Sequence, residues 1–175
     1  MANDVLNDMV VFSTDKSELE RLLKDGETML NGETMFNGKL RQFCFHALLP
    51  MPKEYDNNNG LTPIIWQQEN WGAKWGPYHV ELGTIQEDIS NAQDGYSLRI
   101  TYTTAWSNCT EGLRRLVEKY NVSFSGKYFD INGQCYAGTY HISQDETSES
   151  VLSNKKAREF ALKENLCEKE NIYDY

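Results

Sequence analysis

The pattern of apolar and polar positions at the start of the chain predicts a strand followed by a helix. Val5 to Ser13 reads as the strand. Residues of the types that cap helix N-termini follow it, at Thr14, Asp15 and Ser17. The apolar residues with helical spacing come next, at Leu19, Leu22 and Leu23, and Asp25-Gly26 ends the helix.

Residues 27–76 break this regular pattern and predict a long insertion. Near its start, GETMLN at residues 26–31 is repeated as GETMFN at residues 32–37. The asparagine that ends each copy is followed by a glycine, and because Asn-Gly favours tight turns, we expect a short hairpin here. Phe43 to Ala47 is predicted as a short strand. A helix is then expected to begin near Pro63, which suits the first helical position, and to end near Asn70.

Two half-buried strands and a helix come after the insertion. Apolar residues alternate with polar ones from Tyr78 to Leu82 and again from Leu98 to Trp106, with a turn expected between Ser90 and Gly95. Thr110 is a suitable N-cap for the next helix. Its apolar face repeats at i, i+3, i+4 and i+7, at Leu113, Leu116, Val117 and Tyr120.

The last part of the chain predicts a hairpin, a loop and a helix. Strands at Val122 to Tyr128 and Tyr136 to Ile142 flank Asn132-Gly133, a dipeptide that favours a tight turn. Residues 144–175 are predicted as a C-terminal loop and helix: Gln144 to Ser150 as the loop, then a helix capped by Ser153. This helix would turn Ala157, Phe160 and Ala161 towards the sheet.

Without the insertion, the order is strand, helix, strand, strand, helix, strand, with an extra hairpin strand and a terminal helix. This is the order of a split βαβ unit. We therefore predict an α+β fold with an antiparallel sheet and helices on one face. The whole chain, 1–175, is expected to form a single domain, with the insertion between the first helix and the second strand.

Composition indicates a folded protein and limits the classes of partner that it can bind. Hydrophobic residues make up 39% of the 175 residues and aromatic residues 12%, which is enough apolar surface for a core without metals or disulfides. No apolar run reaches the length of a membrane span, and the N-terminus does not resemble a signal peptide, so a cytoplasmic protein is expected. The net charge of −9 argues against direct nucleic-acid binding and is explained either by a basic protein partner or by solubility alone.

Motifs for catalysis, metals and cofactors are missing from the sequence. The cysteines have no metal-ligand spacing; they are Cys44, Cys109, Cys135 and Cys167. His46, His79 and His141 are predicted in strands without a second ligand nearby. No phosphate-binding loop, dinucleotide fingerprint or nucleophile elbow occurs. We therefore expect no cofactor, no metal and no catalytic residue, and a protein that is not an enzyme.

Aromatic residues at the end of the insertion are the best candidates for binding. Trp71, Lys74 and Trp75 could form an aromatic and cationic platform. Trp106 and Tyr136 could border the same insertion. The structural alternative is that Trp71 and Trp75 pin the insertion onto the sheet and that Trp106 fills the core. The sequence leaves both interpretations open.

Several short motifs carry a resemblance to a known family. They are FHALLPMPKE at Phe45–Glu54, NWGAKWG at Asn70–Gly76, TTAWS at Thr103–Ser107 and CYAGTY at Cys135–Tyr140. In this order they resemble the YubB-like family of phage and plasmid proteins over roughly residues 5–142. The resemblance implies a ferredoxin-like domain of uncharacterised function. This chain departs from the family by lacking a tryptophan near its N-terminus and prolines after TTAWS.

These observations lead to three functional hypotheses. The first is a non-enzymatic binding protein of a phage or other mobile element that occupies a host protein surface, such as a defence or nucleic-acid-processing complex. The second is a small-ligand or nucleotide binder, or an enzyme, that uses a cleft between the insertion and the sheet, lined by Lys74, Trp106 and Tyr136. The third is single-stranded nucleic-acid binding across the sheet beside Arg99 and Lys127. The sequence does not give the oligomeric state.

Overall fold

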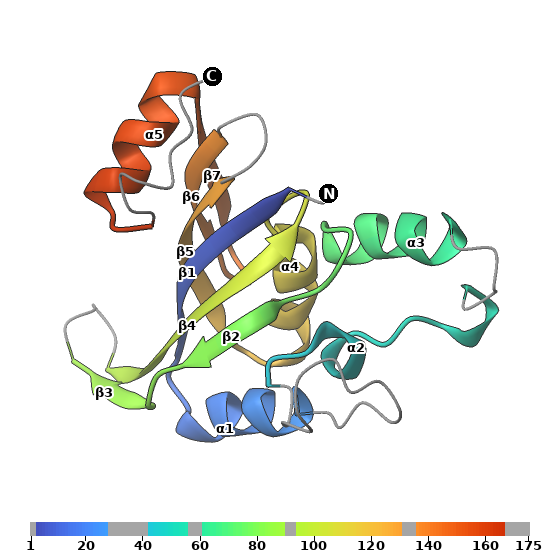
Figure 1. Cartoon of the computed structure of the whole chain (residues 1–175). Coiled ribbons are helices and arrows are strands. Elements are labelled where there is room, and N and C mark those ends of the chain that lie inside the picture. Colours follow the sequence, from blue (N-terminus) through green and yellow to red (C-terminus); the bar gives the residue numbers. More distant parts are fainter. Residues whose placement is uncertain (1–2, 28–41, 56–60, 90–93, 131–135, 167–175) are drawn as a thin grey trace.

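A seven-stranded antiparallel sheet forms the centre of the protein (Figure 1). The computed structural model describes residues 3–27, 42–55, 61–89, 94–130 and 136–166. The strands follow the order β2-β4-β1-β5-β6-β7, and β3 also pairs with β4. Their bounds are β1 Asp4–Ser13, β2 Tyr78–Leu82, β3 Gln86–Asp88, β4 Gly95–Ala105, β5 Ser123–Asp130, β6 Tyr136–Ile142 and β7 Thr147–Ser153.

The order β5-β1-β4-β2 is that of the predicted split βαβ unit, and β6 and β7 extend it on one side. The first strand lies at the centre: Asp4 to Ser13 pair with Ala105 to Tyr96 of β4, and Val5 to Phe12 pair with Asp130 to Ser123 of β5. The predicted fold class is thereby confirmed.

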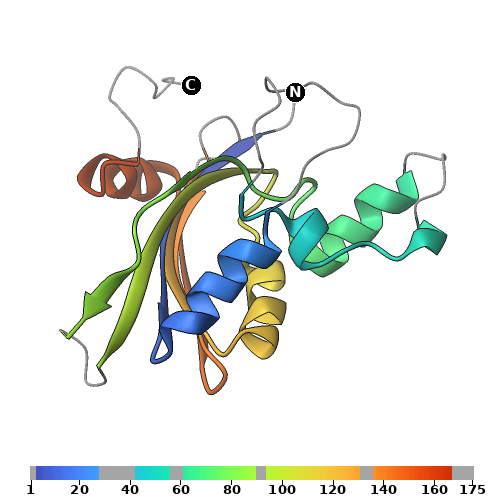
Figure 2. The same cartoon turned by 90° about the horizontal axis from the view of Figure 1, so that it is seen from below.

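Helices cover both faces of the sheet (Figure 2). Lys16–Asp25 forms α1 and Thr110–Lys119 forms α4, both on one face, as predicted. Asn154–Lys163 forms α5, which packs on the opposite face. There its Ala157 and Ala161 join Phe129 of β5 in a second, smaller apolar cluster. The prediction of helices on one face is therefore right for the split βαβ unit and incomplete for the whole chain.

The main core lies between the sheet and the helices α1 and α4. Alternate residues of each strand face it, because successive side chains of a strand point to opposite faces. From the sheet these are Val5, Met9, Val11, Leu98, Ile100, Tyr102, Phe124, Tyr128, Tyr140 and Ile142. Leu19 and Leu22 of α1 and Leu113 and Leu116 of α4 meet them.

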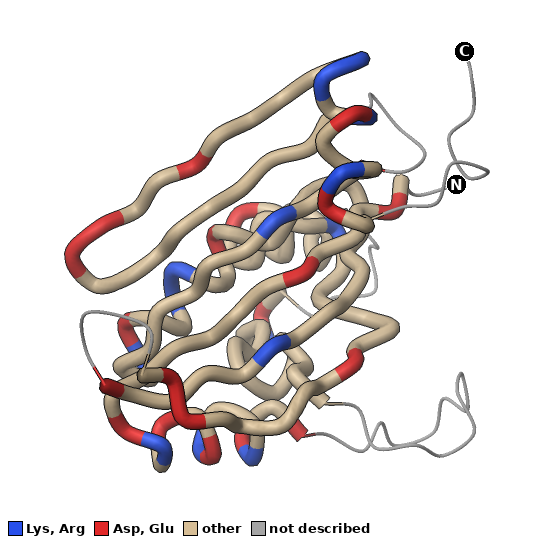
Figure 3. The backbone as a smooth tube through the Cα atoms, turned by 90° about the vertical axis from the view of Figure 1, so that its left-hand side faces the viewer, with Lys and Arg blue, Asp and Glu red and all other residues tan. Residues whose placement is uncertain are grey.

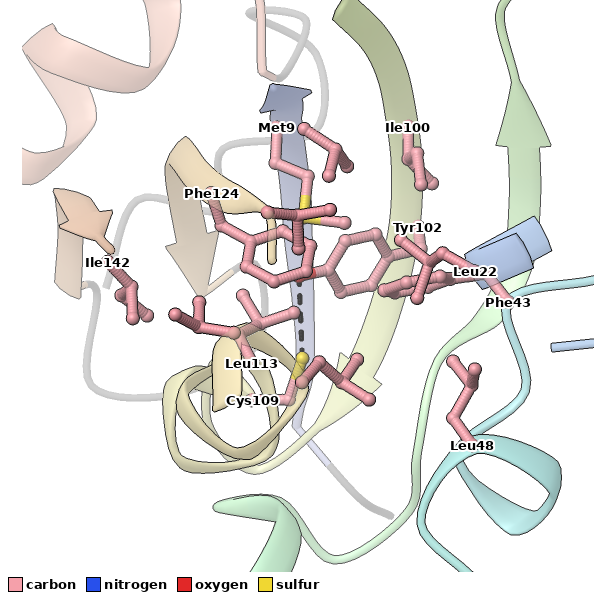
Figure 4. Packing of buried hydrophobic residues seen from close by; sticks show 14 of the residues in the cluster. Met9, Leu22, Phe43, Leu48, Ile100, Tyr102, Cys109, Leu113, Phe124 and Ile142 are labelled. Carbon is pink, nitrogen blue, oxygen red and sulfur yellow. Dashed lines mark hydrogen bonds between the residues drawn. The ribbon is translucent and has the colours of Figure 1, made fainter. Parts of the chain in front are cut away.

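A short chain of polar atoms runs through this apolar core. The Cys109 thiol donates to the Tyr102 hydroxyl at 3.4 Å (Figure 4), and the hydroxyls of Tyr102 and Tyr140 lie 3.4 Å apart. Tyr140 in turn donates to the sulfur of Met9 at 3.5 Å. Each buried hydroxyl thus has a partner, which removes the free-energy penalty of burying it unpaired.

The insertion contributes to this core instead of lying outside it. Phe43, Phe45 and Trp71 are fully buried, and their rings pack edge to face in sequence, at centroid distances of 5.8 and 6.0 Å. The intervening helix α3, Leu61–Trp71, contacts α4 and the short 3-10 helix η1, Lys53–Tyr55. The repeated hexapeptides lie mostly outside the described residues.

Two local predictions are wrong. Phe43 to Ala47 was expected to be a strand, but Phe45–Leu48 is the short helix α2, which turns Phe45 and Leu48 into the core. A short apolar run suits a buried helix as well as a strand. Gln144 to Ser150 was expected to be a loop, but Thr147–Ser153 is β7, paired with β6 along its length. Its polar composition follows from its exposure at the edge.

Smaller differences concern caps and turns. Asp15 caps α1 by accepting from the Ser17 amide at 2.9 Å, as predicted. At α4 the cap position is Cys109 instead of Thr110, and no side chain bonds there. Strand β3, which pairs with the start of β4, was not predicted. The predicted turns at Ser90 to Gly95 and Asn132-Gly133 fall largely outside the described residues.

We predict that Gly112→Ala destabilises the protein, although alanine usually favours a helix over glycine. A Cβ on Gly112 would lie 2.2 Å from Cε2 of the Phe45 ring, so the ring or α4 would have to move. Overpacking of this kind costs about 1–3 kcal/mol, which exceeds the ~1 kcal/mol gained in helix propensity. Urea unfolding followed by circular dichroism should show the loss. The exposed Arg115→Ala on the same helix is the control, and increased stability of Gly112→Ala would contradict the packing.

Candidate functional site

Four of the predicted binding residues come together at one end of the sheet. The ammonium group of Lys74 lies 4.8 Å from the ring centroid of Trp75 and 4.4 Å from that of Trp106. Trp75 is 47% exposed and Trp106 is 40% exposed. The hydroxyl of Tyr136 donates to the backbone carbonyl of Trp106 at 2.9 Å. We call Lys74, Trp75, Trp106 and Tyr136 the tryptophan–lysine cluster.

In the NWGAKWG segment, buried residues hold the chain so that Lys74 and Trp75 face outward. Trp71 is fully buried, and its indole N–H donates to the Leu49 carbonyl at 3.0 Å. Gly72 then turns the chain with a φ of 79°, a conformation that glycine adopts without strain. Ala73 is buried again, so Lys74 and Trp75 face outward.

The end of the segment passes close to the core at Gly76. A Cβ at this position would lie 3.0 Å from the Cβ of Phe45, a tight contact that glycine avoids. The segment is further tied to β4, because the Lys74 amide donates to the Ala105 carbonyl at 3.1 Å and the Ser107 hydroxyl donates to the Gly72 carbonyl. The two halves of the cluster are therefore fixed to each other.

Trp106 has an unusual backbone conformation, with a φ of 78°. This left-handed region costs a non-glycine residue roughly 1–2 kcal/mol, so surrounding contacts must hold it. The Trp106 amide donates to the Asn3 carbonyl at 2.8 Å, and its carbonyl accepts the Tyr136 hydroxyl. The Thr104 hydroxyl donates to the Ser107 carbonyl at 2.7 Å. These bonds direct the indole out of the core and towards Lys74.

A polar network borders the cluster on the side of β7. The carboxylate of Glu149 accepts from Asn108 and from the Tyr128 hydroxyl, each at 2.9 Å. The Tyr128 ring packs against Tyr136 with centroids 5.7 Å apart. Burial, together with the charges of Asp130 and Glu149, raises the pKa of Tyr136, so its hydroxyl stays protonated and can donate. The sequence did not indicate this network, because Glu149 was expected in a loop.

Comparison with known proteins gives the family. A family model described as "Ferredoxin-like domain in Api92-like protein" matches residues 71–175, more than half of the chain. The chain belongs to this family. No curated protein and no solved structure matches the chain.

The matched range contains the whole tryptophan–lysine cluster but not the first strand and helix. It begins at Trp71, whereas β1 and α1 lie within residues 4–25. The resemblance noted from the sequence was expected over about residues 5–142, so the matched range begins and ends later. Both assignments agree on a ferredoxin-like fold.

The structure separates the three tryptophans into one buried and two exposed side chains. Trp71 belongs to the core, so its structural interpretation holds and it cannot contact a partner from the surface. Trp75 and Trp106 are both exposed, and the expectation that Trp106 fills the core is wrong. The reason lies in Gly72 and in the left-handed Trp106, which redirect neighbouring side chains in a way that helix or strand periodicity does not predict.

The face of the sheet around Arg99 and Lys127 carries an ion-pair network. Arg99 donates to both carboxylate oxygens of Asp8, at 2.8 and 2.9 Å, and Lys127 lies 3.5 Å from the same carboxylate. The exposed large aromatic residues of the described chain are Tyr55, Trp75 and Trp106, and none lies within β4 or β5. Figure 3 shows charges of both signs scattered over the strands. Within the described residues, Arg99 and Lys127 are thus held in ion pairs, and β4 and β5 carry no exposed large aromatic ring on which a single-stranded nucleic acid could stack.

The described residues offer little for catalysis or metal binding. No group of three or more His, Cys, Asp or Glu within them could hold a metal ion. Burial raises the pKa of the Cys109 thiol to about 12, so this cysteine is not a thiolate nucleophile. His46 lies in α2 and not in a strand as predicted. Ser125 Oγ and His141 Nδ1 are 2.8 Å apart, yet no described carboxylate forms an ion pair with His141 to orient it as a base.

None of the helices within the described ranges is both long and apolar enough to cross a bilayer.

We predict that Trp71→Phe and Trp75→Phe have different effects on stability. The first removes buried volume and leaves the Leu49 carbonyl without its donor, at a cost of about 1–4 kcal/mol. The second shortens a half-exposed side chain and should cost less than about 0.5 kcal/mol. Unfolding by urea, followed by circular dichroism at 222 nm, measures both. Equal losses would contradict the division into a core and a surface tryptophan.

We also predict that the stabilising effect of Asp8 disappears in acid. Burial alone would raise the pKa of Asp8, but the hydrogen bond and charge of Arg99, with the charge of Lys127, lower it below 3.8. A carboxyl group with a lowered folded-state pKa stabilises the fold above its unfolded-state pKa, and this contribution is lost as pH falls. Asp8→Asn should therefore unfold more easily than the wild type near pH 7, and the difference should narrow below about pH 4.

The matched control for this pH series is Asp145→Asn, which removes an exposed carboxylate outside the ion pairs of the described residues. It should change stability by less than about 0.5 kcal/mol at pH 7. A difference between wild type and Asp8→Asn that stays constant from pH 7 to pH 3 would show that the ion-pair network contributes nothing.

Proposed function

We propose that this chain is a non-enzymatic binding protein whose contact surface is the tryptophan–lysine cluster. The observation that supports this most is the ammonium group of Lys74 lying against two exposed indoles, at 4.8 and 4.4 Å. Burying a tryptophan side chain removes a large apolar surface from water, which is favourable. Tryptophan is also enriched among the residues that contribute most of the binding free energy at interfaces. Here two of them are held rigid beside a cation.

Rigidity is what distinguishes these two tryptophans from apolar residues that are merely exposed. The backbone of Trp106 is bonded on both sides, to Asn3 and to Tyr136, and the segment of Trp75 is tied to Ala105 through the Lys74 amide. A surface that is fixed before binding loses little conformational entropy when a partner docks. The cluster is therefore suited to act as an anchor for a protein surface.

The proposed partner is a host protein. The resemblance to YubB-like phage and plasmid proteins supports an origin in a mobile element, acting in the bacterial cytoplasm on a defence or nucleic-acid-processing complex. The net charge of −9 favours a partner surface with basic residues around the contact and opposes binding to phosphates. The paired state of Arg99 and Lys127 is consistent with this.

A second function is favoured by one observation at the same place. Lys74 forms no ion pair within the described residues, so its ammonium group keeps donors for an anionic ligand. A nucleotide could place its base against an indole and its phosphate near Lys74. The cluster would then be a small-ligand site.

We predict that Trp75→Ala and Trp106→Ala abolish capture of a partner from a lysate of the bacterial host, while Tyr55→Ala does not. Tyr55 is the matched control because it is 40% exposed, like Trp106, but lies outside the cluster. Removing an anchor tryptophan typically weakens binding by about 2–4 kcal/mol, roughly 30- to 1000-fold. The captured proteins are compared by quantitative mass spectrometry after pull-down with each immobilised variant.

Capture that is equal for wild type, Trp75→Ala and Trp106→Ala would refute the cluster as the contact surface. A parallel thermal-shift series with nucleotides separates the two functions. Stabilisation of the wild type by a nucleotide, lost in Lys74→Ala, would favour the small-ligand site over the protein surface.

A further inference from the structure

The two edges of the sheet differ in how they are protected against pairing with another chain. On one side, β2 has five residues and β3 has three, and Gly83 lies between them. The pairing of β2 with β4 shifts register between Tyr78 and Glu81, and His79 has a φ of 50°. Short, irregular strands of this kind are a common protection of sheet edges.

The opposite edge, β7, has none of these features. Its seven residues, Thr147–Ser153, pair with β6 without interruption. It contains no proline, lysine or arginine, and its single charged residue, Glu149, is bonded to Asn108 and Tyr128. Val151 is 61% exposed. The helix that follows, α5, packs over one face of β5, β6 and β7, and β7 is the last strand of the sheet on this side within the described residues.

The backbone of β7 is oriented so that its unpaired groups lie at Glu149 and Val151. The carbonyl oxygen of Ser150 points to β6, because a Cβ built on Gly138 would lie 2.1 Å from it. Backbone groups of successive residues in a strand point to opposite sides. The N–H and C=O groups of Glu149 and Val151 therefore face outward, towards any strand added at this edge.

We propose that two copies of this chain pair through β7, antiparallel and related by a two-fold axis at Ser150. Ser150 is the middle residue of the strand, so this register pairs all of β7. It places Glu149 opposite Val151 of the second copy. The exposed Val151 side chain is then partly covered, and the two Glu149 carboxylates do not face each other. The two sheets then become one continuous sheet across the dimer.

Charges beyond the ends of β7 complement each other in this arrangement. Asp145 and Glu146 precede the strand, and Lys155 and Lys156 follow it, and all four are exposed. Antiparallel pairing brings the acidic end of one copy to the basic end of the other, twice per dimer. Parallel pairing would place like charges together. Complementary charge thus favours a second copy, in this orientation, as the occupant of the edge.

The first test is the oligomeric state of the full chain and of Val151→Glu. A single pair of edge strands buries little surface, so the dimer should be weak, with a Kd of roughly micromolar or above. Sedimentation equilibrium of the wild type, up to about 0.5 mM, should show a concentration-dependent dimer. Val151→Glu places a second carboxylate opposite Glu149 of the other copy, and because the two like charges repel, dimerisation should weaken at least about 10-fold. Circular dichroism confirms that the variant is folded.

The second test uses cysteine cross-linking and does not depend on a destabilising variant. In the proposed register the two Ser150 residues form a non-hydrogen-bonded pair with Cα atoms about 4.5 Å apart, close enough for a disulfide. Two Ser148 residues would be about 14 Å apart, which is too far. With Cys135 and Cys167 changed to serine in both proteins, Ser150→Cys should form a disulfide dimer on mild oxidation and Ser148→Cys should not.

Both results are needed, and each can overturn the proposal. A wild-type chain that remains a monomer at 0.5 mM refutes self-pairing, and the edge would then be open to an extended segment of another protein. A dimer that is unaffected by Val151→Glu, or that cross-links through Ser148→Cys instead of Ser150→Cys, refutes pairing through β7 in this register.

Discussion

Burial of Trp71 in the core is the contact on which the placement of the functional surface depends. Its indole packs against Phe45, Trp66 and His46 and donates its N–H to Leu49, so the end of the insertion has one position relative to the sheet. From this fixed point, the turn at Gly72 and the close passage at Gly76 bring Lys74 and Trp75 to the end of β4. The exposed part of the motif is held in place by its buried part.

The same arrangement explains why two glycines lie against Phe45. Its ring is next to Gly112 of α4 and its Cβ is next to Gly76, so the insertion approaches the helix and the turn closely on both sides. Interiors packed to this density respond to added atoms as well as to missing ones. The insertion is in this respect a structural component of the domain and not an appendage.

Sequence periodicity predicted the elements in which burial alone decides the structure. In β4 and α4, alternate or helically spaced residues face the core, and these elements were predicted correctly. β7 was missed because six of its seven residues are exposed and its pairing uses backbone groups that the residue types do not reveal. The cluster was predicted only in part, because Trp106 takes a left-handed backbone that depends on bonds to Asn3 and Tyr136.

The central place of β1 has a consequence for how the chain folds. This strand is synthesised before its partners in the sheet, Gly95–Ala105 and Ser123–Asp130, which lie far along the chain. Until β4 has left the ribosome, β1 has no strand to pair with, whereas local units such as helix α1 can already form. Closing such distant pairs is slow compared with forming helices and hairpins. The nascent chain therefore passes through a period in which the apolar side chains of β1 are open to chaperones or to other nascent chains.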